Sequence, residues 1–438
     1  MSQQKENFKR EIGIRPLTLA IINSTIGTGI FVLPAIIAQS LGAASIIAYL
    51  VCGLLISLIA LCYAEVGSKT EVSGGTYEYI EAAFGPFAGF IANNIYWFGA
   101  CITADAAFIN ALADTLKYFF PFLSDELYRV IFFIIIFGGL TLLNIRSVKY
   151  GVRFMEIATV AKLFPLMFLV FAGVNFISTD NLKWTFTPSF HDISSASLIL
   201  FFAFMGMEVP LSNGGEIKNP KRTVPVSILI SIVLVLILYI ALQMITQGVL
   251  GNTIAAHKDA PLAAVANVIV GKAGMTIVLI TTAVSMLGIF SGDILCIPRI
   301  LFAGARDGIM PKVLAKVHPK YFTPYIAIAA YAFLGFLMAT FGGFTQLVIL
   351  SSASLLLIYL GIVLATLKLR KTSQQNNQKT FRVPGGPIIP LLAIAVSIWL
   401  LSSLSKAEFI GIAIFIAGLS VVYFFIDMMK RKKVSSKI

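Results

Sequence analysis

Long runs of apolar residues follow one another along almost the whole chain of 438 residues. A bilayer core needs roughly 20 apolar residues per helical span, and about twelve stretches of that length are present. With 58% hydrophobic and 12% charged residues, the chain is too apolar for a soluble protein. The sequence therefore predicts an all-α membrane protein in which residues 1–438 form a single transmembrane domain. The expected spans lie near 16–40, 43–66, 87–118, 126–145, 152–177, 194–216, 224–247, 274–303, 324–341, 344–367, 386–404 and 408–427.

The positive charges give the expected orientation of these helices. A net charge of +13 could indicate a nucleic-acid partner. If the N-terminus is placed in the cytoplasm, however, most of the 33 lysines and arginines fall on the cytoplasmic side, and only Lys162 lies within a span. This distribution follows the positive-inside rule. We therefore predict a multi-pass protein of the cytoplasmic (inner) membrane with both termini cytoplasmic and no nucleic-acid partner.

The cysteines and histidines show no pattern of a metal centre or a catalytic site. All four cysteines lie in apolar segments without a CxxC pair, and the three histidines are scattered over loops and span ends. No nucleophile lies beside a base. We therefore expect no metal, no cofactor and no enzymatic activity.

Glycine interrupts two of the expected spans. The first span contains Gly27-Thr28-Gly29 in its middle, and the sixth contains Gly206 shortly before Glu208 and Pro210. Because the breaks are five spans apart, the second unit enters the membrane from the opposite side, which is typical of an inverted repeat. We expect repeats at about 12–177 and about 190–368, followed by two further helices at about 386–428.

A broken helix exposes backbone N–H groups at one half-helix end and carbonyls at the other. Unpaired groups of this kind cost several kcal/mol in lipid, and a zwitterion can pair with both sets. Close helix packing is the alternative explanation for Gly27-Thr28-Gly29, because small residues are common at helix interfaces in membranes. A dinucleotide-binding loop is excluded, because neither a preceding strand nor a suitably spaced acidic residue is present. The second break favours a substrate site.

Six motifs in order make the chain similar to one known group of proteins. They are GTGIF at 27–31, Ser73-Gly74-Gly75, FAFMGME at 202–208, EIKNPKRTVP at 216–225, Arg299 with ARDG at 305–308, and FRVPGGP at 381–387. With these motifs the chain resembles the amino acid, polyamine and organocation transporter superfamily, nearly end to end. The resemblance implies the leucine-transporter fold and alternating access at a midplane site made by the first and sixth spans, with help from the third and eighth.

The resemblance also implies how an amino acid would be held. The Gly27, Thr28 and Gly29 backbone would meet its carboxylate. The carbonyls near Thr25 and Ile26, and those of Phe202 and Met205, would meet its ammonium group. Phe202 would be an aromatic gate above the site, although an ordinary core or lipid-facing phenylalanine is an equal alternative.

Four ionisable residues fall inside expected spans, namely Asp105, Lys162, Glu208 and Asp293. Each costs several kcal/mol there unless it is paired or hydrated, so each is a functional candidate, with a structural ion pair as the alternative. By the resemblance, Lys162 would replace a sodium ion between the unwound first span and the eighth span, with Ser291 as a partner. We therefore expect sodium-independent transport, with Lys162 or Glu208 involved in proton coupling or gating.

The remaining acids suggest a substrate. By comparison with the superfamily, Asp105 and Asp293, with Cys101, would line the pocket for the substrate side chain. Two acids suit a cationic side chain, and so arginine, lysine or ornithine are expected substrates. A neutral amino acid is the alternative substrate, because Lys162 could neutralise one of the two acids.

A channel is disfavoured as the class of protein, because pore-lining polar repeats are missing. Exchange, net uptake, and a monomeric or homodimeric state all remain open.

Overall fold

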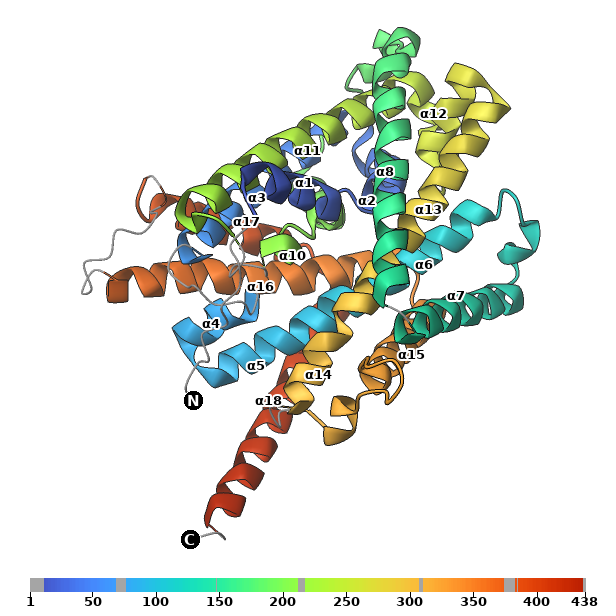
Figure 1. Ribbon diagram of the computed structural model, residues 1–438. Coiled ribbons are helices and arrows are strands. Elements are labelled where there is room, and N and C mark those ends of the chain that lie inside the picture. Colours follow the sequence, from blue (N-terminus) through green and yellow to red (C-terminus); the bar gives the residue numbers. More distant parts are fainter. Residues whose placement is uncertain are drawn as a thin grey trace.

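The computed structural model describes residues 12–67, 76–146, 148–211, 217–306, 310–373, 383 and 385–435. Helices make up nearly all of these residues (Figure 1). The described part contains no β-strand, only an isolated bridge between Ile12 and Ile217. The motif residues Ser73-Gly74-Gly75, Glu216, 307–308, 381–382 and Pro384 lie outside the described residues.

Each expected span contains a helix, and the all-α prediction is confirmed. The α-helices are α1 Ile14–Thr25, α2 Gly29–Leu41, α3 Ile46–Gly67, α4 Thr76–Phe84, α5 Pro86–Asn94, α6 Thr103–Leu116, α7 Glu126–Arg146, α8 Val148–Gly173, α9 Phe190–Phe201, α10 Glu208–Leu211, α11 Pro220–Leu250, α12 Pro261–Val270, α13 Lys272–Cys296, α14 Pro298–Arg306, α15 Tyr325–Phe341, α16 Phe344–Ser373, α17 Ile388–Leu401 and α18 Lys406–Ser435. Helix α12, between α11 and α13, lies outside the expected spans.

Many of these helices have the length and the hydropathy that a membrane-spanning helix needs. In the described part, 7 helical stretches are long and apolar enough to cross a membrane, and shorter apolar helices occupy the other expected positions. Helix α18 leaves large side chains such as Phe409, Ile414 and Val421 exposed. Since lipid tails are as apolar as these residues, this surface suits contact with the bilayer. The number of about twelve spans stays a prediction.

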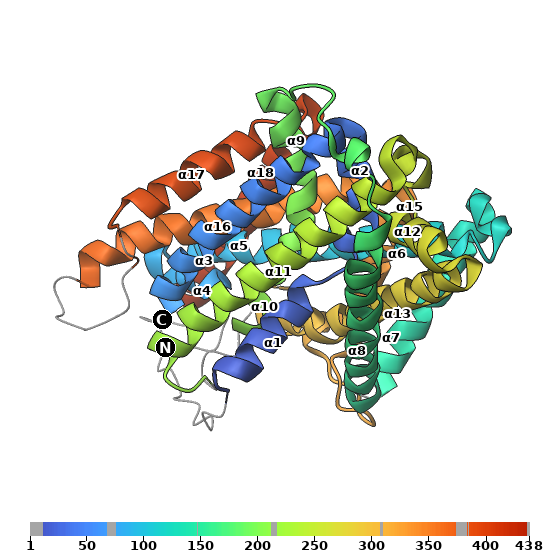
Figure 2. The same cartoon turned by 90° about the horizontal axis from the view of Figure 1, so that it is seen from above.

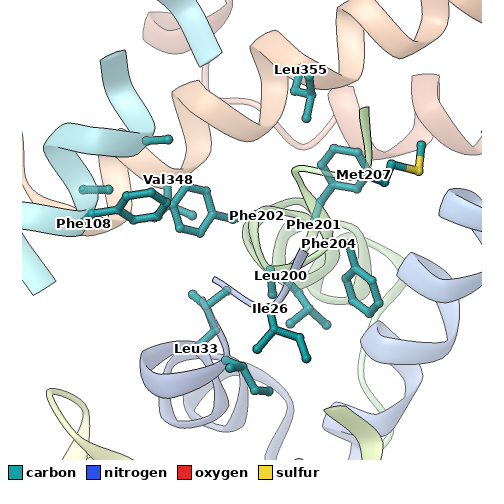
Figure 3. Packing of buried hydrophobic residues seen from close by; sticks show 14 of the residues in the cluster. Ile26, Leu33, Phe108, Leu200, Phe201, Phe202, Phe204, Met207, Val348 and Leu355 are labelled. Carbon is teal, nitrogen blue, oxygen red and sulfur yellow. The ribbon is translucent and has the colours of Figure 1, made fainter. Parts of the chain in front are cut away.

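The first expected span is broken where its glycines predicted a break. Helix α1 ends at Thr25, and α2 begins at Gly29. A Cβ on Gly29 would lie 2.8 Å from the Cα of Ala203, which belongs to the sixth span. Only glycine therefore allows the two backbones to approach this closely. Figure 3 shows Ile26 of this break close to Leu200 of α9.

The sixth span is broken in the same region of the molecule. Helix α9 continues into a 3-10 turn at Phe202–Phe204, and α10 starts at Glu208. Between them, Gly206 has a φ of +103°, and a Cβ there would lie 2.5 Å from the Ser24 carbonyl oxygen. A left-handed backbone and a close neighbour both require glycine here. The two breaks therefore lie against each other, and α1 and α10 pack together beside α11 (Figure 2).

The third span changes its helical form halfway. Between α5 and α6 the chain forms a π-helical segment at Ile95–Ile102. Thr103 donates to the Gly99 carbonyl at 2.5 Å, and Ser351 of α16 donates to the Ala100 carbonyl at 2.7 Å. These hydroxyl groups provide partners for carbonyls in the wider turn, and π-helical segments of this kind are frequent at functional sites.

Candidate substrate site

A cavity of about 330 Å³ lies where the two helix breaks meet. Parts of the first, third, fifth, sixth and eighth expected spans form its wall. Most of the predicted site residues line it, namely Thr25, Gly27, Thr28, Gly29, Cys101, Lys162, Phe202, Met205, Glu208 and Asp293. Three predicted residues, Ile26, Asp105 and Ser291, are buried outside its lining. No group of three or more histidine, cysteine or acidic side chains able to hold a metal ion occurs in the described part of the chain.

Lys162 of α8 binds the end of the broken first helix. Its Nζ donates to the carbonyl oxygens of Asn23 and Ile26, both at 2.6 Å, and the residue is only 2% exposed. The ammonium group thereby pairs with carbonyls that the break takes out of the regular helical pattern. The predicted contact with Ser291 is wrong, because the Ser291 hydroxyl has no hydrogen-bond partner among the described residues. A role of Ser291 in coupling stays a prediction.

Tyr239 of α11 connects the two breaks, and sequence reasoning missed it. Its hydroxyl group lies 3.0 Å from the Thr25 carbonyl oxygen and 2.9 Å from that of Ala203, so the two acceptors share one proton. The side chain is fully buried. A tyrosine in a long apolar helix needs a partner for its hydroxyl group, but this general signal does not identify the partner.

The carbonyls expected to bind a substrate ammonium group are therefore partly occupied. Ile26 accepts from Lys162, and Thr25 accepts from Tyr239. Thr25 also accepts from the Gly27 amide at 2.8 Å, so both of its lone pairs are occupied, whereas the Ile26 carbonyl oxygen has a second lone pair to which a further donor can bind. Phe202 accepts a longer hydrogen bond, at 3.4 Å, from the Met205 amide.

We expect Tyr239→Phe to lower substrate uptake about tenfold or more, because the buried carbonyls of Thr25 and Ala203 each lose the hydrogen bond from Tyr239, at a cost of about 1–3 kcal/mol. The measurement is initial uptake into proteoliposomes, together with the melting temperature. Tyr49→Phe is the matched control, because Tyr49 is equally buried but donates to the Gln243 side chain and not to a carbonyl of either break. The control should retain uptake close to wild type. Equal loss of uptake in both variants would show that Tyr239 has no special link to the site.

Glu208 lies at the start of α10, on the cavity wall. One of its carboxyl oxygens, Oε2, accepts a short hydrogen bond from the Tyr359 hydroxyl group of α16 and a second from the Gly206 amide at 3.2 Å. The carboxyl group therefore connects the second break to α16. This position is compatible with its predicted role in gating.

Phe202 packs against a second aromatic ring on the cavity wall. Its ring centroid lies 5.5 Å from that of Phe108 of α6, in a T-shaped arrangement, and both residues line the cavity (Figure 3). The sequence alone did not single out Phe108. The wall also includes Ala20 of α1 and Ile297 after α13, so the cavity extends toward the side on which α1 begins.

The two acidic residues that were predicted to bind the substrate side chain differ in their position relative to the cavity. Asp293 of α13 is on the cavity wall, whereas Asp105 of α6 is fully buried and does not line the cavity. The Asp105 Oδ2 accepts a hydrogen bond of 2.7 Å from Tyr331 of α15, which holds the carboxyl group away from the cavity. The two carboxyl groups still lie close enough to interact. The prediction that both acids line the pocket is therefore wrong for Asp105.

A bundle of membrane helices in which two broken helices meet at a cavity is typical of secondary membrane transporters. The family model described as amino acid permease matches residues 12–431. The chain therefore belongs to the amino acid permease family, which supports the expectation that it is not an enzyme.

Several characterised proteins are similar over nearly the whole chain. The branched-chain amino acid permease BcaP of Bacillus subtilis (strain 168) is 28% identical over 446 residues, covering 96% of this chain and 93% of the relative. The methylthioribose transporter of the same organism is 27% identical over 451 residues, covering 96% and 94%. Its serine/threonine exchanger SteT is 28% identical over 446 residues, covering 99% and 100%.

Proposed function

We propose that this protein is a sodium-independent secondary transporter that moves amino acids across the cytoplasmic membrane by alternating access. The observation that carries the proposal is the meeting of two helix breaks at one buried cavity. Helix α2 begins at Gly29, so its first backbone N–H groups have no partner within the helix and suit a carboxylate. The carbonyls of the breaks suit an ammonium group.

Sodium independence rests on Lys162. Its ammonium group already supplies a positive charge to the carbonyls of Asn23 and Ile26. A metal cation at the same carbonyls would be repelled by this charge. Uptake into proteoliposomes with sodium or with choline in the buffer tests the proposal, and a requirement for a sodium gradient would overturn it.

We further propose a preference for cationic side chains, bound at Asp293. The acid lies on the cavity wall, and a desolvated ammonium or guanidinium group needs such a counter-charge. Lys162 does not neutralise it, because no ion pair of Lys162 occurs within the described ranges. A neutral substrate is the second candidate. It is favoured by the burial of Asp105 behind the wall and by the neutral amino acids named for BcaP and SteT.

Asp293→Asn should weaken the binding of arginine, lysine and ornithine by about 10- to 100-fold, the equivalent of one charge-assisted hydrogen bond. Neutral amino acids should lose much less. The measurement is the rise in melting temperature of the purified protein with each ligand, since ligands that bind the folded state stabilise it. Asp180→Asn is the control, because Asp180 is exposed and pairs with Lys183. Equal losses for all ligands would contradict charge recognition, and shifts with neutral ligands alone would favour the second candidate.

The remaining parts of the proposal concern topology. We propose cytoplasmic termini, two inverted repeats at about 12–177 and about 190–368, and two added helices at about 386–428. The bridge between Ile12 and Ile217 supports this arrangement, because it places the start of α1 and the segment before α11 on one side.

A further inference from the structure

Three polar side chains from three helices meet beside the substrate cavity. Asp293 of α13 lies on the cavity wall, Asp105 of α6 lies behind it, and Tyr331 of α15 donates to Asp105. Asp105 and Tyr331 are 0% and 1% exposed. The three residues therefore form a buried polar cluster that reaches the cavity only through Asp293. We call it the carboxyl pair with its tyrosine.

One oxygen of the cluster has no donor. Oδ2 of Asp105 accepts from the Tyr331 hydroxyl group, but Oδ1 accepts no hydrogen bond from the described residues although it is buried. An ionised carboxyl group can only accept hydrogen bonds. A buried acceptor without a donor costs about 1–3 kcal/mol, and more for a charged group. Oδ1 therefore needs a proton, a cation or another donor.

Asp293 is a candidate for that donor, because α6 and α13 are packed together and its carboxyl group interacts with that of Asp105. Two ionised carboxyl groups that interact directly repel each other. The other titratable groups around the pair are Cys101 and Tyr96 of the π-helical segment, Glu208, Cys296 and Tyr331. None of these carries a positive charge, and neither acid has a lysine or arginine partner among the described ion pairs.

We propose that Asp105 and Asp293 share one proton, that Tyr331 holds Asp105 in place for this, and that a cationic substrate side chain displaces the proton. The inference rests on the proposed substrate site. On binding, the ammonium or guanidinium group takes the place of the proton between the two carboxyl groups, where it pairs with Asp293 and provides the cation that Oδ1 of Asp105 needs. The displaced proton passes to water in the cavity. The charge of the site is unchanged, because one positive charge enters and one leaves. A neutral substrate leaves the proton in place. The pair is therefore a site of substrate–proton exchange separate from Lys162.

Infrared spectroscopy of the ligand-free protein tests the shared proton without any substrate. We expect a carbonyl stretch of a protonated carboxylic acid that disappears in Asp105→Asn and is retained in Glu208→Gln, which controls for the other acid at the cavity. Loss of the band in Glu208→Gln alone would overturn the proposal, as would an unchanged spectrum in Asp105→Asn. If Asp105→Asn does not fold, Tyr331→Phe replaces it. There the band should shift, because Asp105 loses a hydrogen bond, and an unshifted band would contradict the pair.

Calorimetry tests the displacement. Lysine and its neutral analogue norleucine are titrated in two buffers of different ionisation enthalpy, which gives the number of protons released on binding. We expect wild type to release about one proton when it binds lysine and none when it binds norleucine. The Asp105→Asn variant should release none when it binds lysine. Binding of lysine without proton release would overturn the displacement. Binding of norleucine alone would refute the cationic preference, and binding of no amino acid would refute the proposed function. In both cases the infrared result still decides whether the proton is shared.

Discussion

Lys162→Ala should abolish net transport, with at least a 100-fold fall in initial uptake. The substitution removes two charge-assisted hydrogen bonds, from Nζ to the carbonyls of Asn23 and Ile26. Each bond of this type contributes about 1.5–3 kcal/mol, and 100-fold corresponds to about 2.8 kcal/mol. The carbonyls then remain buried without a donor, and the end of α1 loses its link to α8. The order of preference among substrates should change little, because Lys162 makes no hydrogen bond or ion pair with Asp293 or Asp105 among the described residues.

Uptake into proteoliposomes and ligand-induced melting shifts measure these two effects separately. Lys162→Met keeps the apolar stem and removes only the charge, so it should resemble Lys162→Ala in uptake. Lys183→Ala is the control, because Lys183 is exposed and pairs only locally with Asp180. Uptake above one tenth of wild type in Lys162→Met would mean that the ammonium group is not needed. Recovery of uptake by added sodium would indicate that a metal ion can take its place.

The second large effect is expected at Gly206. In Gly206→Ala, the new Cβ would lie 2.5 Å from the Ser24 carbonyl oxygen, and the φ of +103° strains any residue with a side chain. Strain of about 1–3 kcal/mol from the backbone adds to about 1–3 kcal/mol from overpacking. The breaks must separate to relieve both, so we expect loss of uptake and a clear fall in melting temperature. Gly29→Ala should act similarly, since its Cβ would lie 2.8 Å from the Cα of Ala203.

Gly27→Ala distinguishes steric strain from a general need for glycine. The nearest side-chain atom to a Cβ at Gly27, the Ile289 Cδ1, is 3.8 Å away, which is an ordinary contact. This variant should melt close to wild type, although it lines the cavity and can bind substrate less well. Gly418→Ala on α18 is the control for Gly206→Ala and Gly27→Ala, because a Cβ at Gly418 would have no atom within 4 Å. A Gly206→Ala protein as stable and active as Gly27→Ala would refute the close contact between the breaks.

The sequence predicts the helices and the breaks well because both follow from local chemistry. Apolar runs in lipid must form helices, and glycine is needed where two backbones approach, as at Gly29. The contact of Lys162 with the first break was predicted from the resemblance to the superfamily, and local chemistry indicates only that an ammonium group inside a span must find acceptors. The candidate residues on the cavity wall therefore include most of those chosen from the sequence.

The contacts made by tyrosines could not be predicted. Tyr239 and Tyr331 reach partners on other helices, and nothing local in the sequence identifies such partners. The burial of Asp105 was missed for a different reason. Asp105 was placed on the pocket wall by comparison with the superfamily, and such a comparison does not show that Tyr331 holds its carboxyl group behind the wall. The expected contact of Ser291 failed because helix register alone does not fix which way a hydroxyl group points.

The π-helical segment at Ile95–Ile102 also bears on how this site can diverge between relatives. Relative to an α-helix, a π-helical turn accommodates an additional residue, and each residue in an α-helix turns the chain by about 100°. Deletion of one residue there can convert the wide turn into an α-helical turn while α5 and α6 keep their positions, so only the residues of the segment, such as Tyr96 and Cys101, move relative to Asp105. A single codon gained or lost would thus change the substrate pocket in one step, with both ends of the span in place.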